Sequence, residues 1–291
     1  MKRDLWGLEL PAPAKLNLFL HVVGRRADGH HLLQSVFRMV DLQDSLRFMP
    51  REDGEIRMSC NVSELVGAED LCVRAARLLK AQAGHAGGVD ILLEKRIPMG
   101  GGLGGGSSDA ATTLMVLNAQ WSLGLTAAEL AALGLKLGAD VPFFLGMRSA
   151  FAEGVGEKLT PVTLPAAWYL VLVPPVSVPT AGVFAAQELT RNTKTITISS
   201  FSAGPGLYQS GFGHNDLEPV VCSRYPQVAE HLAWLKQQAN ARMSGSGACV
   251  FAEFATEREA RAAASRMPEG MQGHVVRGLD RHPLGVFLDQ G

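Results

Sequence analysis

The sequence contains little cysteine, few aromatic residues and almost no net charge. Its 291 residues include four cysteines, and aromatic side chains make up 7% of the chain. Cys60, Cys72, Cys222 and Cys249 are widely spaced and form no C-x-x-C pair. This spacing predicts buried thiols rather than a zinc site or a disulfide framework. The net charge of −1 argues against a protein that mainly binds nucleic acid or a membrane surface.

Long apolar runs are also absent. No run approaches the roughly 18 residues of a transmembrane helix, and residues 1–11 lack the apolar core of a signal peptide. We therefore expect a cytoplasmic protein with no membrane partner and no nucleic-acid partner. Hydrophobic residues form 47% of the chain and charged residues 19%, as in ordinary globular proteins. The length suffices for two packed domains, and small molecules are the expected ligands.

Glycine, in contrast, is abundant and concentrated. Residues 98–111 read PMGGGLGGGSSDAA, and six of the seven residues from Gly100 to Gly106 are glycine. Glycine loses much backbone freedom on folding but lets successive N–H groups approach one anion. A helical pattern follows, with a serine as its expected N-cap. This arrangement predicts a phosphate cradle at a helix N-terminus rather than a flexible linker.

Two well-known glycine motifs do not fit this segment. A P-loop requires a lysine after its last glycine, but Ser107 follows Gly106. Gly100, Gly102 and Gly105 match G-x-G-x-x-G, yet no acidic residue lies between Asp109 and Glu129. The carboxylate that binds ribose in dinucleotide sites is therefore missing.

Two further polar residue groups are candidates for a reactive site. Residues 14–23 alternate as a β-strand that would project Lys15 and Asn17 from the same face; a solvated lysine on a strand edge is the alternative. Asp140 is the only charge in residues 137–145. It either caps a helix that has Pro142 in its first turn, or pairs with a lysine beside a substrate hydroxyl.

The remaining pattern predicts a mixed α and β chain with a domain boundary near Leu164, which gives domains 1–164 and 165–291. The second half fits a two-layer α+β domain. Residues 243–248 form a second glycine loop, which is either a simple turn or a backbone nest that faces the first. Strands are expected at 32–40, 45–49, 89–94, 168–173, 249–254 and 274–278, a hairpin at 150–159, and helices at 70–83, 126–137, 180–189, 227–238 and 256–267.

Several of these segments together resemble the GHMP kinases, a superfamily of small-molecule kinases. The resemblance covers about residues 11–254, and the glycine segment matches the family's phosphate-binding motif. The other matching segments are PAKLNL (13–18), RADGHH (26–31), LGADVPFF (137–144), NDLEP (215–219) and SGSGACVF (244–251). The resemblance implies a two-domain α+β GHMP kinase fold. Its N-terminal domain would be like domain 2 of ribosomal protein S5 and its C-terminal domain ferredoxin-like, with the active site between them.

This resemblance also implies an activity and roles for particular residues. It implies an ATP-dependent kinase that phosphorylates an alcohol, and the branch with these motifs acts on a cytidine diphosphate-linked methylerythritol in isoprenoid synthesis. Asp140 matches the base for the substrate hydroxyl and Lys15 its partner. Asn17 and His31 match substrate contacts. The cytosine ring would lie between Phe184 and His30, which replaces the tyrosine usual in the family.

The nucleotide contacts implied by the family lie along the first glycine segment and near it. Mg²⁺ is implied by the phosphate chemistry, with the Ser107 hydroxyl near it and no carboxylate ligand evident. The assembly would be a monomer or a homodimer. A kinase for homoserine or mevalonate and a non-catalytic nucleotide-binding protein are the alternatives. The expected ATP-binding residues are Asp70, Leu71, Lys95, Pro98, Met99, Gly100, Gly101, Gly102, Leu103, Gly104, Gly105, Gly106, Ser107 and Ser108.

Overall fold

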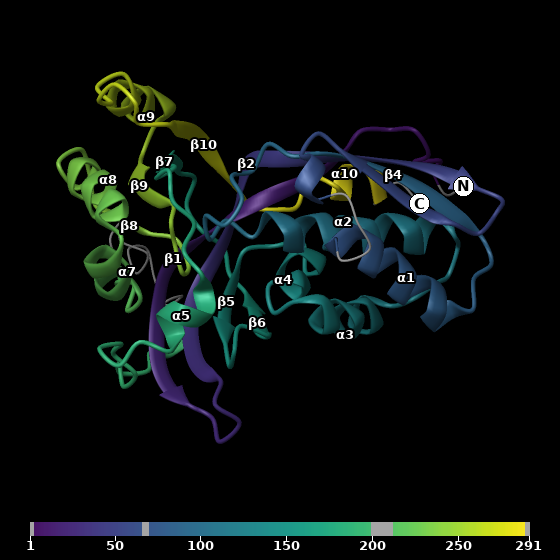
Figure 1. Ribbon diagram of the computed structural model, residues 1–291, viewed down its shortest axis with the longest axis horizontal. Coiled ribbons are helices and arrows are strands. Elements are labelled where there is room, and N and C mark those ends of the chain that lie inside the picture. The colour runs from purple at the N-terminus through teal and green to yellow at the C-terminus, as the bar shows by residue number, and fades with distance from the viewer. Residues whose placement is uncertain (1–2, 66–69, 199–211, 289–291) are drawn as a thin grey trace.

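Two long antiparallel strands form the framework of the computed structural model, which describes residues 3–65, 70–198 and 212–288. They are β1 (Leu10–Arg25) and β2 (His31–Arg51), and they run between the two halves of the molecule (Figure 1). The prediction of two strands at 32–40 and 45–49 was wrong, because β2 is continuous. Its residues 43 and 44 pair with Pro13 and Ala12 across a register shift in β1, so pairing bridges the expected gap.

The N-terminal half places helices on one face of a sheet (Figure 1). Next to β2 lies β4 (Gly88–Glu94), which pairs in parallel with β3 (Ile56–Cys60). The predicted hairpin forms as β5 (Ala150–Glu153) and β6 (Lys158–Pro161), and β5 pairs with β2. The helices of this half are α1 (Leu71–Ala83), α2 (Gly105–Gln120), α3 (Ala127–Leu137) and α4 (Val141–Leu145), with a short 3-10 turn at Ser63–Leu65.

Local sequence signals explain where most of these helices begin. The Asp70 carboxylate caps α1 by accepting a hydrogen bond from the Cys72 N–H, and the expected capping box opens α3 at Thr126. The prediction of a serine cap for α2 was wrong. Its N-cap is Gly104, whose φ of 73° turns the chain directly into the helix. The two serines that follow therefore lie within the first turn of α2.

The C-terminal half has the βαββαβ order of a ferredoxin-like domain, as expected. Its strands lie in the order β10-β7-β9-β8, and all three pairings are antiparallel. The helices α7, α8 and α9 gather over this part of the sheet (Figure 1). The elements are β7 (Trp168–Leu172), α7 (Glu218–Arg224), α8 (Pro226–Lys236), β8 (Ala241–Met243), β9 (Val250–Phe254), α9 (Glu257–Ala264) and β10 (Gly273–Leu279).

One predicted helix of this half is much shorter than expected. The pattern predicted residues 180–189, but α5 (Thr180–Phe184) ends after five residues. The Arg191 guanidinium donates hydrogen bonds to four carbonyl oxygens between residues 184 and 189. These carbonyls are thereby satisfied without a continued helix.

The two halves share strands and core residues. Val40 of β2 pairs with Gly278 of β10, which joins their sheets. Leu20 of β1 packs in the C-terminal core, whereas Leu284, just before α10 (Gly285–Leu288), packs in the N-terminal core. The boundary near Leu164 stays a prediction. Within the described ranges, no helix is both long and apolar enough to cross a membrane.

Candidate active site

The first glycine loop is packed tightly between β1 and the C-terminal half. A Cβ atom on Gly102 would overlap the Ser244 carbonyl oxygen, and one on Gly104 would lie 3.0 Å from Lys15 Cγ. Both glycines have positive φ, at 74° and 73°, a backbone conformation that residues other than glycine rarely adopt. The Lys15 N–H donates a 2.8 Å hydrogen bond to the Leu103 carbonyl. These contacts fix the loop and exclude the linker interpretation.

The second glycine loop lies against the first, as the nest interpretation predicted. The Ser244 hydroxyl donates to the Gly102 carbonyl at 3.1 Å and accepts from the Asn17 N–H at 3.2 Å. The buried Asn215 amide donates 2.8 Å hydrogen bonds to the carbonyls of Met243 and Gly245. The two halves of the protein are therefore connected by hydrogen bonds directly at the glycine loops.

Two cavities flank the first glycine loop and share it as a wall. The first cavity, of about 570 Å³, lies between the start of α1, the segment after β4 and the start of α2. The second, of about 360 Å³, lies between the two glycine loops, β1 and α4. Gly100, Gly102, Gly104 and Ser107 line both cavities. A phosphate group held by the loop would therefore lie close to both spaces.

The first cavity contains nearly all the predicted nucleotide contacts. Asp70, Leu71 and Lys95 line it together with residues 98–107, whereas Ser108 is buried and does not line it. Sequence reasoning missed Leu65 and Ile97, which also line this cavity and carry no signal beyond their apolar character.

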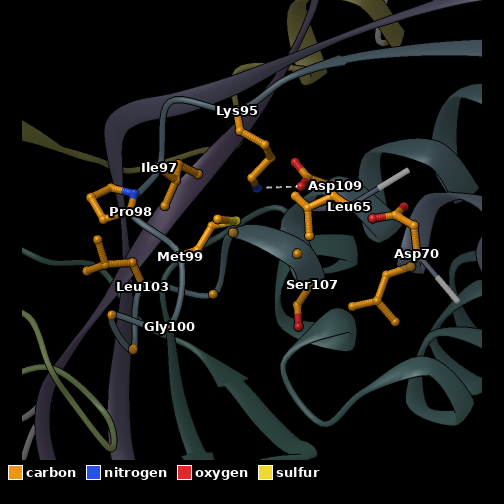
Figure 2. Close-up of a pocket in the computed structure, with 16 residues that line it drawn as sticks. Leu65, Asp70, Lys95, Ile97, Pro98, Met99, Gly100, Leu103, Ser107 and Asp109 are labelled. Atoms are coloured by element: carbon orange, nitrogen blue, oxygen red, sulfur yellow. Dashed lines mark hydrogen bonds and ion pairs between the residues drawn. The ribbon is translucent and has the colours of Figure 1, made fainter. Parts of the chain in front are cut away.

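A buried charge cluster lies at the edge of the first cavity. The Lys95 ammonium binds the Asp109 carboxylate at 2.7 Å (Figure 2). It also binds the Asp44 carboxylate. Asp44 further accepts hydrogen bonds from two backbone N–H groups, those of residues 96 and 97. Two carboxylates share one ammonium, and burial first, then the Asp44 charge, raises the pKa of Asp109. No sequence pattern indicated either carboxylate, because Asp44 lies in β2 and Asp109 in α2, and only the fold brings both to Lys95.

The second cavity brings together Lys15, Asn17 and Asp140. The Lys15 ammonium lies 3.3 Å from the Asp140 carboxylate and donates a 2.5 Å hydrogen bond to the Asn17 side-chain oxygen. It also lies 4.9 Å from the centre of the Phe37 ring, and Asn17 donates to the Ser35 hydroxyl at 2.9 Å. Sequence reasoning missed Phe37 and Ser35, which lie on the neighbouring strand β2.

Burial differs sharply across this ion pair. The Lys15 side chain is 5% exposed and the Asp140 side chain 32% exposed. Asp140 precedes α4 but makes no capping hydrogen bond, so the structure favours the lysine-pair interpretation over the helix cap. The ammonium is thus held by three neighbours while the carboxylate remains open to the second cavity.

A third cavity, of about 340 Å³, adjoins the second and shares Leu33, Val155 and Phe184 with it. His30 and His31 line this third cavity. The His31 ring stacks on Phe184, with centroids 5.1 Å apart and planes inclined by 29°. The His30 side chain is 69% exposed, and its nearest charged partner is Asp28 at 3.3 Å.

A magnesium ion in this site would have few protein ligands. Over the ranges that the structure describes, no group of three or more His, Cys, Asp or Glu side chains could hold a metal. The Ser107 hydroxyl belongs to the wall shared by both cavities. Mg²⁺ often takes most of its ligands from phosphates and water, with few from the protein.

Comparison with protein families agrees with this architecture. Residues 70–147 match the model of the GHMP kinases N terminal domain, and residues 202–273 match that of the GHMP kinases C terminal domain. The first match includes the glycine loop and Asp140. The second includes Asn215 and the second glycine loop.

Individual proteins and structures are similar over nearly the full length. The 4-diphosphocytidyl-2-C-methyl-D-erythritol kinase of Nitrosospira multiformis is 59% identical over 97% of this chain and 95% of its own. That of Thiobacillus denitrificans is 59% identical over 96% of this chain and 98% of its own. A crystal structure of 4-(cytidine 5'-diphospho)-2C-methyl-D-erythritol kinase is 36% identical, with a TM-score of 0.82 over 93% of this chain and 99% of that one. A homoserine kinase from Cytophaga hutchinsonii shares the fold at 16% identity, with a TM-score of 0.74 over 97% of both chains.

Proposed function

The chain belongs to the 4-diphosphocytidyl-2-C-methyl-D-erythritol kinases of the GHMP kinase family, and from this premise we propose how its residues carry out the reaction. It is an ATP-dependent phosphotransferase of the methylerythritol phosphate route to isoprenoids. We propose that ATP occupies the first cavity and that the 2-hydroxyl of 4-diphosphocytidyl-2-C-methyl-D-erythritol enters the second. The observation that carries this proposal is the glycine loop shared by the two cavities.

On the donor side, the loop and the start of α2 supply the phosphate contacts. Backbone N–H groups at a helix N-terminus favour negative charge, and the glycines let a phosphate approach the backbone closely. The terminal phosphate of ATP would lie at the shared wall, near Gly104 and Ser107. Asp70, Leu71 and Lys95 would border the adenosine, with the Lys95 ammonium held by its two buried carboxylates.

On the acceptor side, Asp140 would accept the hydrogen of the attacking hydroxyl. Its carboxylate is the more exposed member of the ion pair and lines the second cavity. Lys15 would orient this carboxylate and offset negative charge on the phosphoryl group as it transfers. Because Lys15 is held by Asn17 and Phe37 as well, its position is set before substrate binds, which reduces the reorganisation needed during transfer.

The third cavity would hold the cytidine portion of the acceptor. Phe184 lies between the second and third cavities, so one ligand can extend from Asp140 to the two histidines. The stacked pair of His31 and Phe184 supplies aromatic surface for a pyrimidine. His30 would be the opposite wall, with a smaller ring than tyrosine offers.

Magnesium would be held by the ATP phosphates and the Ser107 hydroxyl. When bound, it would neutralise phosphate charge. The partners are then small molecules only. We further propose a cytoplasmic location, where ATP is supplied, and a monomer or homodimer as the assembly.

A coupled assay of ADP release across several acceptors tests this function. We expect turnover with the cytidine diphosphate-linked methylerythritol and none with homoserine or mevalonate. Turnover only with an acceptor that lacks cytidine would favour another GHMP kinase activity. ATP binding without turnover on any acceptor would favour a non-catalytic nucleotide-binding protein.

A further inference from the structure

Arg191 binds both elements that form the third cavity. Its Nη atoms donate hydrogen bonds to the carbonyls of Phe184 and Leu189, at 3.2 and 3.0 Å, and to those of Ala186 and Gln187. Its Nε atom donates a 3.1 Å hydrogen bond to His31 Nε2. One guanidinium therefore fixes the segment after α5 and the histidine ring stacked on Phe184.

The hydrogen bond from Arg191 determines which His31 nitrogen carries the proton. An arginine side chain has donors and no acceptor. His31 Nε2 must therefore present a lone pair, and a neutral imidazole then carries its hydrogen on Nδ1. Within the described ranges, His31 Nδ1 has no hydrogen-bond partner in the protein, and the ring lines the third cavity. The donor is thus available to a ligand.

The charges around His31 also favour this neutral form. Partial burial is the main cause that lowers the pKa of His31, and the positive charge of Arg191 is the next. Arg25 at the end of β1 and His30 in the turn before β2 add smaller effects in the same direction. Arg191, Arg25 and His30 therefore all disfavour the imidazolium.

We infer that Arg191 is a positioning residue for the cytosine ring of the acceptor substrate. It acts by holding His31 as a neutral imidazole with its hydrogen on Nδ1. The inference rests on the proposed function in placing a pyrimidine in the third cavity. A His31 Nδ1–H donor held in one place favours a pyrimidine whose facing ring atom accepts a hydrogen bond. Cytosine N3 is an acceptor, whereas uracil N3 carries a hydrogen. Arg191 would therefore favour a cytidine-linked acceptor over its uridine counterpart without contacting the base.

Imidazole ¹⁵N NMR of the ligand-free protein tests the tautomer directly. We expect His31 to show an unprotonated Nε2 and a protonated Nδ1, and to remain neutral at a lower pH than an exposed histidine. In Arg191→Gln the two tautomers should mix and the pKa of His31 should rise. An unprotonated Nδ1 in the unaltered protein, or an identical tautomer and titration in Arg191→Gln, would overturn the inference.

Kinetics with two acceptors then test the link to the base. Arg191→Gln should raise the KM for the cytidine-linked acceptor more strongly at about pH 8 than at about pH 6. At about pH 8 the neutral His31 ring of the variant mixes its two tautomers, whereas the imidazolium formed at lower pH carries hydrogen on both nitrogens and keeps the Nδ1 donor. Arg191→Gln should also reduce the preference over the uridine-linked acceptor by about tenfold, as expected for one hydrogen bond. The KM for ATP should not change. The link between Arg191 and the base would be overturned if the variant kept the same preference for the cytidine-linked over the uridine-linked acceptor, and if the KM of the variant relative to that of the unaltered protein did not change with pH.

Arg224→Gln is the matched control. Arg224 also holds the α5 segment, through a 3.1 Å hydrogen bond to the Gly182 carbonyl and an ion pair with Glu188, but does not contact His31. The Arg224→Gln substitution should leave the His31 tautomer and the preference for cytosine unchanged. Equal changes in both variants would mean that Arg191 only stabilises the segment after α5, which would overturn the inference. Because the NMR measurement needs no substrate, it remains valid even if the ADP-release assay rejects the proposed acceptor.

Discussion

Replacing Gly104 by alanine adds a single methyl group to the wall between the first and second cavities. The added Cβ would lie 3.0 Å from Lys15 Cγ, 3.2 Å from Lys15 Cε and 3.2 Å from Phe144 Cζ. Lys15 is tied at its ammonium to Asn17 and Asp140. The lysine stem therefore has to shift while its charged end is held, and we expect the ammonium to leave its position beside Asp140.

Two costs follow and can be separated. The φ of Gly104 is +73°, and a left-handed conformation costs an alanine about 1–2 kcal/mol. Misplacement of a group at the reaction centre by about 1 Å lowers turnover by up to about 100-fold. Because Lys15 needs to move by only part of that distance, we expect kcat to fall by about tenfold. The backbone cost lowers stability, whereas the Lys15 contact lowers kcat.

Gly124→Ala supplies the control for the backbone cost alone. Gly124 has a φ of +71°, and a Cβ there would meet nothing within 4 Å. Urea unfolding should show similar losses of stability for the two variants, and coupled ADP release should show the loss of kcat only for Gly104→Ala. If Gly104→Ala retains the kcat of the unaltered protein, the Lys15 position does not depend on this contact and the reasoning is refuted.

Two further predictions concern groups around the cavities. Burial raises the pKa of Asp109, so the folded state binds a proton that the unfolded state releases and stability falls as pH rises above about 4. Urea unfolding of Asp109→Asn should therefore show a weaker fall than the unaltered protein, and an identical pH profile would contradict the raised pKa. Asn215→Leu should destabilise the protein by about 1–3 kcal/mol, because it leaves buried carbonyls of the second glycine loop unpaired. It should also lower kcat. Urea unfolding measures the stability and ADP release measures kcat; unchanged stability would exclude this role for Asn215.

Short-range patterns in the sequence predicted much of the fold. The capping box at Thr126 and the hairpin of residues 150–159 each depend on neighbouring residues, and both form as expected. The end of α5 was wrong because it depends on Arg191, whose hydrogen bonds satisfy carbonyls beyond the helix. The serine cap was wrong because Gly104 can adopt a conformation that starts α2 earlier.

The site shows the same division between local and distant information. The same-face placement of Lys15 and Asn17 followed from strand alternation, and the two side chains do form a hydrogen bond. The pairing of Lys15 with Asp140 joins residues 125 positions apart, so spacing alone left it open. Asp44 was not predicted, because only the pairing of β2 with β4 places it beside Lys95, the residue that follows β4.

The effect of Asp140→Asn on a single turnover tests the proposed mechanism most directly. The amide has nearly the same shape as the carboxylate but does not accept the hydroxyl proton. We predict that the rate of phosphoryl transfer to the cytidine-linked acceptor falls by about 100-fold or more, while calorimetry shows unchanged ATP affinity. A transfer rate equal to that of the unaltered protein would remove Asp140 from the mechanism and contradict the assignment of the second cavity to the acceptor hydroxyl.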